Sequence, residues 1–209
     1  MGKYIIVIVL GYLLGTSNLA YYISKWKHVD FTKSGSRNLG ASNATMLLGW
    51  KTGIMVGLHD SVKSLAAVVI ARLLFPDLEY AGVAAGIASV MGHIFPFYLR
   101  FRGGKGFASY LGMTLALNWK VALAVIGLVL VVTWITDYIV AGTTTTIVVV
   151  PVALGIMYHS WILALILLVG TVIIAYKHRE NFVRIYRGTE FRVRNVGRGE
   201  YRIPGSQNS

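Results

Sequence analysis

The stretch VALAVIGLVLVVTWIT, from Val121 to Thr136, contains no charged residue and decides the class of this protein. A helix needs about 20 apolar residues to cross the hydrocarbon core of a bilayer, and about 17 suffice where the bilayer is thin. Similar runs recur along the 209 residues, of which 56% are hydrophobic and only 13% charged. Soluble proteins carry roughly 25% charged residues. We therefore predict an all-α integral membrane protein.

Outward from this stretch, the apolar runs predict a compact bundle of about seven transmembrane helices with short or re-entrant segments. The predicted spans are Tyr4–Ser24, Thr52–Phe75, Tyr80–Phe97, Phe107–Leu117, Val121–Thr136, Ile139–Tyr158 and Trp161–Tyr176. The fourth is the short one, and the Asn-Trp-Lys sequence after it is typical of an interfacial turn. No repeat or linker is apparent, so residues 1–209 are expected to form a single transmembrane domain, with a basic tail over 177–209.

Basic residues gather on one side of the predicted membrane. Segments 25–51, 98–106 and 177–209 hold 16 of the 20 Lys and Arg residues. Because cytoplasmic loops are enriched in Lys and Arg, we expect the N-terminus outside and the tail inside. The net charge of +12 also indicates anionic lipid headgroups or phosphorylated ligands. Nucleic acid is not expected as a partner, because no basic stretch is interleaved with exposed aromatic residues.

Three glycine-rich or polar stretches interrupt the apolar pattern, and all three fall on the basic side. They are SGSRNLGASN (34–43), GHIFPFYLRFRGGKG (92–106) and YKHRENFVR (176–184), the last continuing to Gly188 and Glu190. Gly103, Gly104 and Gly106 surround Lys105, and such a loop lets backbone N–H groups converge on an anion. The sequence is not a Walker A loop, because glycine replaces the Ser or Thr that would hold magnesium. We predict a phosphate cradle, with a tight turn carrying a snorkelling lysine as the alternative.

The other two stretches favour the same site. Ser36, Asn38 and Asn43 lie among small residues and can form hydrogen bonds to phosphate oxygens or hydroxyls, although alone they would indicate a plain loop. His178 and Asn181 are three residues apart, so they share one face if the last helix continues through them. The alternative for this pair is a basic helix end that satisfies the helix dipole.

Ionisable residues also lie within the second span, where they are costly unless paired or hydrated. Asp60 and Lys63 are three residues apart, so we expect a structural ion pair, with a polar wall of the site as the alternative. His93 is interpreted mainly as a residue that packs a turn. The chain has no cysteine, which excludes a disulfide or a Cys nucleophile. No D-x-x-D or E-x-x-H cluster is present, so no metal site is expected.

Together, the three stretches resemble the signature blocks of the bacterial acyl-phosphate:glycerol-3-phosphate acyltransferases, integral membrane enzymes that make lysophosphatidic acid. The similarity rests on the blocks G-S-x-N-x-G-x-x-N, G-H-x-F-P…F-x-G-G-K-G and K-H-x-x-N…G-x-E. One departure is visible, because members often carry an Arg shortly after the last Asn of the first block, where this chain has Met46. Arg37 is expected to supply the missing cation.

The resemblance implies transfer of a fatty acyl group from acyl phosphate to the sn-1 hydroxyl of glycerol 3-phosphate, in the bacterial cell membrane and without a cofactor. Lys105, His178 and Ser36 are then the expected catalytic residues. The expected substrate-binding residues are Arg37, Asn38, Gly40, Asn43, Gly103, Gly104, Gly106 and Asn181. The expected partners are acyl phosphate, glycerol 3-phosphate and the lipid bilayer, and the protein is expected to be a monomer.

Two features of this interpretation stay open. We favour proton transfer from the acceptor hydroxyl to the donor's own phosphate, with His178 as base or a covalent acyl-Ser36 intermediate as alternatives. A transporter of a phosphorylated metabolite is the rival function, because Asp60, Lys63 and Arg72 lie within predicted spans. It is disfavoured because the polar residues gather at one face and no inverted repeat is apparent. A non-catalytic lipid-binding scaffold would be favoured only if the three stretches were dispersed in space.

Overall fold

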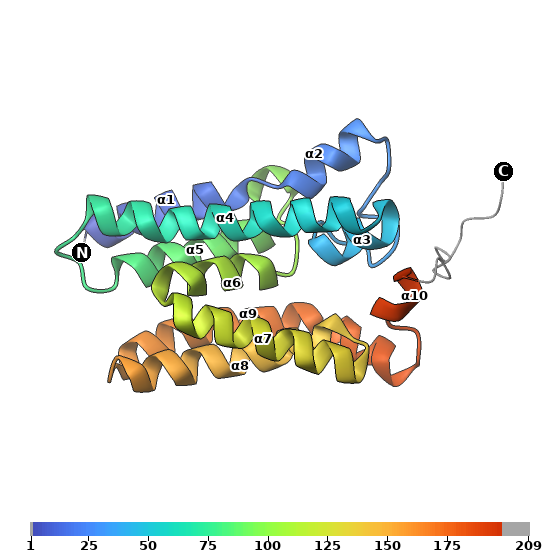
Figure 1. The fold of residues 1–209 in the computed structure, drawn as a ribbon. Helices are drawn as coiled ribbons and strands as arrows, with labels where there is room; N and C mark the ends of the chain where they lie inside the picture. Colours follow the sequence, from blue (N-terminus) through green and yellow to red (C-terminus); the bar gives the residue numbers. More distant parts are fainter. Residues whose placement is uncertain (1, 198–209) are drawn as a thin grey trace.

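A computed structural model describes residues 2–197, and all regular secondary structure in this part of the chain is helical (Figure 1). The elements are α1 (Gly2–Thr16), α2 (Leu19–Trp26), α3 (Ala41–Leu48), α4 (Trp50–Leu74), α5 (Ala81–Ile94), the 3-10 turn η1 (Phe97–Leu99), α6 (Phe107–Leu117), α7 (Trp119–Thr136), α8 (Ile139–Met157), α9 (Trp161–Tyr186) and α10 (Val193–Gly197). The all-α prediction is confirmed.

Six helical segments within residues 2–197 are long and apolar enough to cross a membrane. They are Gly2–Trp26, Trp50–Leu74, Ala81–Leu99, Trp119–Thr136, Ile139–Met157 and Trp161–Tyr186. Helix α6 is apolar but shorter, and its bounds match the predicted short span. The prediction of about seven helices, with one of them short, is therefore confirmed.

The helices run alongside one another in two groups (Figure 1). In the first, α1 packs on α5 and α4 packs on α5 and α6. In the second, α7 packs on α8 and α8 on α9. Contacts of α5 with α9 and of α6 with α7 join the groups, around buried side chains that include Tyr110, Met113 and Leu167. The short helices α3 and α10 lie at the opposite end of the bundle from the N-terminus.

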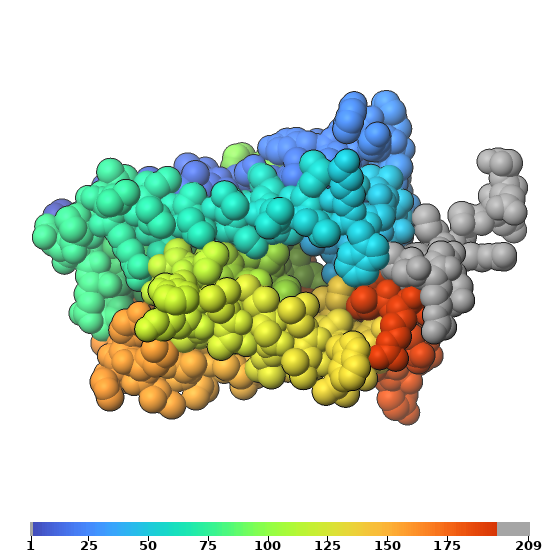
Figure 2. Space-filling view, in the orientation of Figure 1, coloured from blue at the N-terminus to red at the C-terminus, as the bar shows by residue number. Residues whose placement is uncertain are grey.

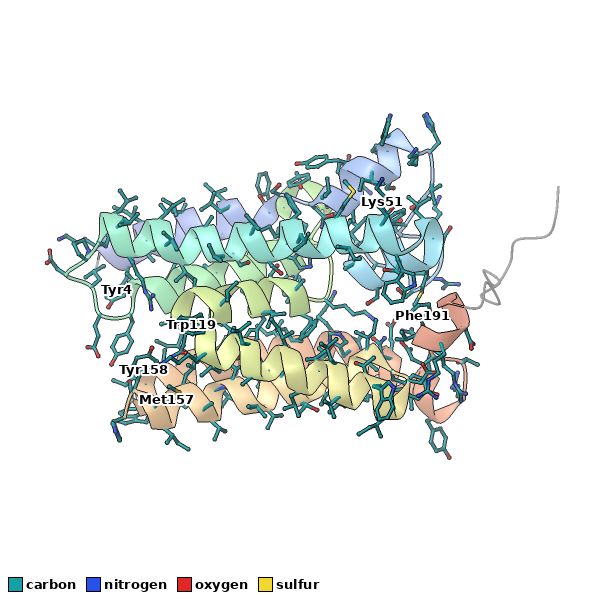
Figure 3. All side chains as sticks on the ribbon, in the orientation of Figure 1. Tyr4, Lys51, Trp119, Met157, Tyr158 and Phe191 are labelled. Atoms are coloured by element: carbon teal, nitrogen blue, oxygen red, sulfur yellow. The ribbon has the colours of Figure 1, made fainter. Side chains whose placement is uncertain are left out.

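Side chains on the outside of the bundle remain apolar, as a lipid-facing surface requires. Leu73 and Trp134 are each 75% exposed. Figure 3 shows Trp119 and Tyr158 at the end that also holds Tyr4, while Lys51 and Phe191 lie at the other end. Aromatic residues are enriched where helices meet the membrane surface. The end that holds Tyr4, Trp119 and Tyr158 therefore resembles an interfacial aromatic belt.

Most predicted span boundaries agree with the helices to within two residues, and three features differ more. The first span is interrupted at Ser17 and Asn18, because the Asn18 side chain accepts a hydrogen bond from the Tyr21 N–H and starts a new helix. The third ends at Ile94 rather than Phe97, because the residue before a proline disfavours the helical conformation and Pro96 follows. The last continues well past Tyr176, to Tyr186.

Candidate active site

The three polar stretches meet in one pocket, at the end of the bundle where α3 and α10 lie. The lining residues that the sequence had singled out in these stretches are Ser36, Asn38, Gly40, Lys105, Gly106, His178 and Asn181. Together with α8, they enclose about 680 Å³ of space, part of it open to solvent. Figure 2 shows the surface hollowed between the two helix groups near this end. The juxtaposition that the acyltransferase interpretation required is therefore present.

Asn43 holds the loop that forms the first wall of the pocket, although it does not line the pocket itself. Its side-chain Oδ1 accepts a 2.7 Å hydrogen bond from the Ser36 N–H. Its Nδ2 donates to the carbonyls of Phe31, at 2.9 Å, and Asn38, also at 2.9 Å. The amide is buried and used inside the loop, so Asn43 shapes the site rather than facing a ligand, contrary to the expectation that it binds substrate.

The loop that Asn43 holds presents Ser36 and Asn38 to the pocket. Asn38 Nδ2 donates a 2.7 Å hydrogen bond to Ser36 Oγ. An amide N–H cannot take a proton from the hydroxyl, so this contact does not activate Ser36 as a nucleophile. The hydroxyl hydrogen is instead free to rotate towards a ligand oxygen.

Arg37 does not take the place that the sequence suggested for it. The residue has a φ of 55° and is exposed, and it is not among the residues that line the pocket. Met46, on α3, lines the pocket instead. The structure therefore does not bring Arg37 to the position of the missing cation.

The glycine-rich loop is anchored to the end of α5. The Gly103 N–H donates to the Ile94 carbonyl at 3.1 Å, and the Gly104 N–H to the His93 carbonyl at 3.2 Å. Both N–H groups are thus occupied, and neither glycine lines the pocket, so the expected cradle of converging N–H groups does not include them. Gly106 has a φ of 92°, which favours glycine, and it starts α6 beside Lys105.

Lys105 brings the positive charge of the loop into the pocket. Its ammonium donates a hydrogen bond to Asn181 Oδ1, joining the second stretch to the third. Burial, followed by repulsion from Arg184, lowers the pKa of Lys105 to about 8, while the Glu190 carboxylate opposes this shift. A lysine with such a pKa is charged at neutral pH and poorly hydrated, which strengthens its attraction for a phosphate.

Helix α9 presents His178 and Asn181 on one buried face, as predicted. His178 Nδ1 lies 2.8 Å from the Ile174 carbonyl. A carbonyl can only accept, so Nδ1 carries the hydrogen and Nε2 of the neutral imidazole is left as an acceptor. This tautomer suits Nε2 to receive a hydrogen bond from a substrate hydroxyl.

Glu190 is a further pocket residue, and it was not among the predicted site residues. Its Oε1 accepts a 2.7 Å hydrogen bond from Asn181 Nδ2, and its Oε2 a 2.7 Å hydrogen bond from Arg184 Nε. The carboxylate is buried because the chain turns back after α9 at Gly188, which has a φ of 68°. The G-x-E part of the third block contains this signal, but helical spacing alone does not bring Glu190 back to α9.

The ion pair predicted within the second span is confirmed, with Lys63 Nζ 2.8 Å from Asp60 Oδ1. Asp60 and His93 also line the pocket. Asp60 therefore both forms a structural ion pair and belongs to the polar wall of the pocket, and His93 does more than pack a turn.

Comparison with known proteins agrees with this site. A profile of the family described as "Glycerol-3-phosphate acyltransferase" matches residues 5–188. A glycerol-3-phosphate acyltransferase of Lactiplantibacillus plantarum is 32% identical over 189 residues, which are 90% of this chain and 91% of that protein. One of Prochlorococcus marinus is 36% identical over 194 residues, covering 90% of this chain and 97% of the relative.

Two crystal structures of PlsY, an integral membrane glycerol 3-phosphate acyltransferase, have the same fold. The glycerol 3-phosphate form has a TM-score of 0.86 and 31% identity, and covers 93% of this chain and 97% of PlsY. The lysophosphatidic acid form has a TM-score of 0.81 and 32% identity, with 90% and 94% covered. The chain thus belongs to the glycerol-3-phosphate acyltransferase family.

Proposed function

We propose that the protein transfers a fatty acyl group from acyl phosphate to the sn-1 hydroxyl of glycerol 3-phosphate, giving lysophosphatidic acid and inorganic phosphate. The observation that carries this proposal is the single pocket in which Lys105, His178 and Ser36 meet. Family membership supports it, as do the glycerol 3-phosphate and lysophosphatidic acid forms of PlsY.

In this proposal Lys105 neutralises the phosphate of the donor. The acyl carbon is attacked by the acceptor oxygen, and the bond from that carbon to the phosphate oxygen breaks. Negative charge then grows on the leaving phosphate, where an ammonium in a partly dehydrated pocket stabilises it most. Ser36, Asn38 and Asn181 supply hydroxyl and amide groups for the remaining phosphate and glycerol oxygens.

The proton of the attacking hydroxyl passes to the leaving phosphate in the mechanism we favour. His178 Nε2 orients the acceptor by accepting a hydrogen bond from its other hydroxyl, at sn-2, which leaves the hydrogen of the attacking sn-1 hydroxyl free to point at the phosphate. Holding both substrates in one pocket lowers the entropic part of the barrier. The contact of Ser36 Oγ with the Asn38 amide disfavours an acyl-serine intermediate. A burst of phosphate from acyl phosphate without acceptor would revive that alternative.

Purified protein in detergent provides the direct test. Given acyl phosphate and glycerol 3-phosphate, the wild type should release phosphate and form a lysolipid in equal amounts. A transporter would need a closed vesicle and would form neither product. Absence of product from folded protein supplied with both substrates would refute the proposed activity.

His178→Ala is expected to raise the KM for glycerol 3-phosphate about tenfold or more, while kcat at saturating acceptor stays within about threefold of wild type. The reason is that the imidazole binds the sn-2 hydroxyl and so orients the acceptor, while the proton of the attacking sn-1 hydroxyl passes to the phosphate. Steady-state rates over a range of glycerol 3-phosphate concentrations give both constants. A collapse of kcat at unchanged KM would instead assign His178 as the general base.

We further propose that the pocket end of the bundle faces the cytoplasm, so that the N-terminus lies outside, and that the chain acts as a monomer with one transmembrane domain. Lys25, Lys51 and Arg100 belong to the basic segments that the positive-inside rule assigns to the cytoplasm. Size-exclusion chromatography with light scattering tests the monomer, and a dimer mass would contradict it.

The cysteine-free sequence allows a simple test of orientation. Lys51 lies in the first turn of α4 and Asp77 three residues beyond its other end, and both are exposed. In intact cells, a membrane-impermeant maleimide should label Asp77→Cys, whereas Lys51→Cys should react only after the membrane is permeabilised. The reverse pattern would invert the proposed topology.

A further inference from the structure

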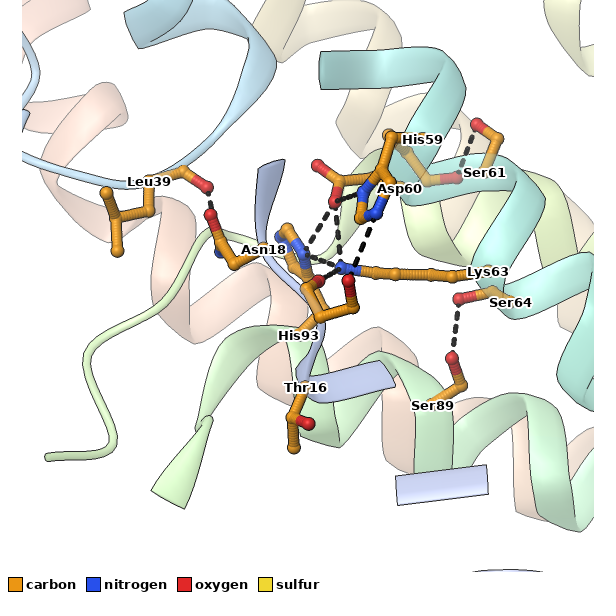
Figure 4. A network of polar contacts seen from close by, with 12 residues as sticks. Thr16, Asn18, Leu39, His59, Asp60, Ser61, Lys63, Ser64, Ser89 and His93 are labelled. Carbon is orange, nitrogen blue, oxygen red and sulfur yellow. Dashed lines mark hydrogen bonds and ion pairs between the residues drawn. The ribbon is translucent and has the colours of Figure 1, made fainter. Parts of the chain in front are cut away.

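A buried polar network surrounds Lys63 (Figure 4), and two of its members, Asp60 and His93, line the pocket. Lys63 Nζ donates to the Ser17 carbonyl at 2.6 Å and to Asp60 Oδ1 at 2.8 Å, and it lies 2.9 Å from His93 Nδ1. An ammonium has three N–H donors, and these three contacts use all of them. Lys63 therefore cannot also bind a substrate phosphate, although it lies close to the site.

The network reaches the glycine-rich loop through His93. The ammonium beside Nδ1 makes that nitrogen an acceptor and leaves the ring hydrogen on Nε2. The Nε2–Cε1 edge of the ring lies against Gly104, so closely that a Cβ at Gly104 would overlap it. The His93 carbonyl also accepts the Gly104 N–H at 3.2 Å. Both the ring and the backbone of His93 thus support the residue that precedes Lys105.

A role in packing alone does not explain this arrangement. A buried ion pair is costly to desolvate, and well-packed apolar residues of the same volume are often at least as stabilising. The side chains of Asp60, Lys63 and His93 are 2%, 6% and 3% exposed, yet Asp60 and His93 border the pocket. Charges placed here fix one orientation of the imidazole, which apolar neighbours would leave free to rotate.

We propose that Asp60 and Lys63 are positioning residues for acyl transfer. They hold the His93 ring in one orientation, and the ring in turn fixes the Gly103–Lys105 loop so that the Lys105 ammonium meets the donor phosphate. Asp60 Oδ1 accepts a hydrogen bond from Lys63 Nζ at 2.8 Å, and it thereby fixes the ammonium that lies 2.9 Å from His93 Nδ1. The inference rests on the proposed function. It adds that this function depends on Asp60 and Lys63, two residues outside the three sequence blocks.

Asp60→Asn tests the proposal, because the amide keeps the shape of the carboxylate and removes its charge. The matched control is Ser64→Ala, which breaks the buried 2.8 Å contact of Ser64 Oγ with Ser89 Oγ between the same two helices, α4 and α5. For each monodisperse variant in detergent, the measurements are kcat, the KM for both substrates, the unfolding temperature and the Kd of an acyl phosphonate, a non-hydrolysable donor analogue.

We expect Asp60→Asn to lower kcat/KM for acyl phosphate by about 10- to 100-fold, as a displacement of about 1 Å in a reacting group does. The Kd of the phosphonate should rise at least fivefold, and the KM for glycerol 3-phosphate should change less. Ser64→Ala should keep all kinetic constants within about twofold even where its unfolding temperature falls. Wild-type constants and wild-type phosphonate binding in folded Asp60→Asn would overturn the proposal.

The double variant Asp60→Asn/Lys63→Met keeps the test decisive if the single variant does not fold. It removes both charges, so no unpaired ion is left buried. Recovery of the unfolding temperature with kcat/KM still low would support a positioning role, because the His93 ring would still lack the contact with the Lys63 ammonium that orients it. Recovery of both would overturn it. A wild-type protein that binds the phosphonate but forms no lysolipid would instead refute the proposed function.

Discussion

Lys105→Ala is expected to lower kcat/KM by about 10²- to 10³-fold while the bundle stays folded. This is the usual effect of removing one preorganised group that stabilises charge in the transition state. The ammonium is the cation that the described glycine-rich loop brings into the pocket, and its hydrogen bond to Asn181 places it between two walls of the site. Rates of phosphate release over a range of acyl phosphate concentrations, measured on monodisperse protein, give the loss in kcat/KM.

Lys51→Ala is the control for this variant. Lys51 is an exposed basic residue at the same end of the molecule and does not line the pocket (Figure 3). It should retain wild-type rates, which would separate the effect of Lys105 from a general loss of positive charge near the membrane surface. Wild-type rates in Lys105→Ala itself would remove this residue from the catalytic site.

Glu190→Gln is expected to lower kcat/KM by about 100-fold near pH 7.5 and to change its pH dependence. In the wild type, kcat/KM should fall as the pH rises through about 8, because the pKa of Lys105 is lowered to about 8 and the neutral amine no longer attracts phosphate. The Glu190 carboxylate favours the charged lysine. Its removal lowers the pKa of Lys105 further, so the alkaline fall should begin at lower pH.

Glu180→Gln is the matched control for the pH profile. Glu180 lies on α9 and is 65% exposed, with Arg184 Nη1 3.9 Å away. Its charge raises the pKa of Lys105 less than that of Glu190 does, and an ion pair this exposed contributes little. Both the rate and the alkaline limb should therefore stay close to wild type. An alkaline limb unchanged in Glu190→Gln would mean that the group titrating in kcat/KM is not Lys105.

The apolar runs predicted the transmembrane helices well because lipid exposure imposes hydrophobicity along the whole of each helix. The predicted and observed bounds of Phe107–Leu117 are the same, since a glycine and an asparagine end its apolar run on either side. The break at Asn18 was missed, because a capping asparagine within an apolar run leaves the average hydropathy high.

The site was predictable in part. Residues of the three blocks do share a pocket, and the three-residue spacing correctly placed His178 with Asn181 on one face of α9. What the sequence could not show is the direction in which each side chain points. Asn43 turns inward to carbonyls of its own loop, Arg37 turns outward, and Glu190 returns to the helix it follows. Each outcome depends on backbone turns that hydropathy and spacing do not encode.

The side-chain amide of Asn181 lies between two opposite charges and keeps them apart. Its amide oxygen faces the Lys105 ammonium and its amide nitrogen faces the Glu190 carboxylate, so neighbours on both sides fix its orientation. Were these two ions in direct contact, each would neutralise the other, and an incoming phosphate would have to displace a carboxylate to reach the lysine. With the neutral amide interposed, the lysine holds only a partner that is easily exchanged, and its charge stays available for the substrate.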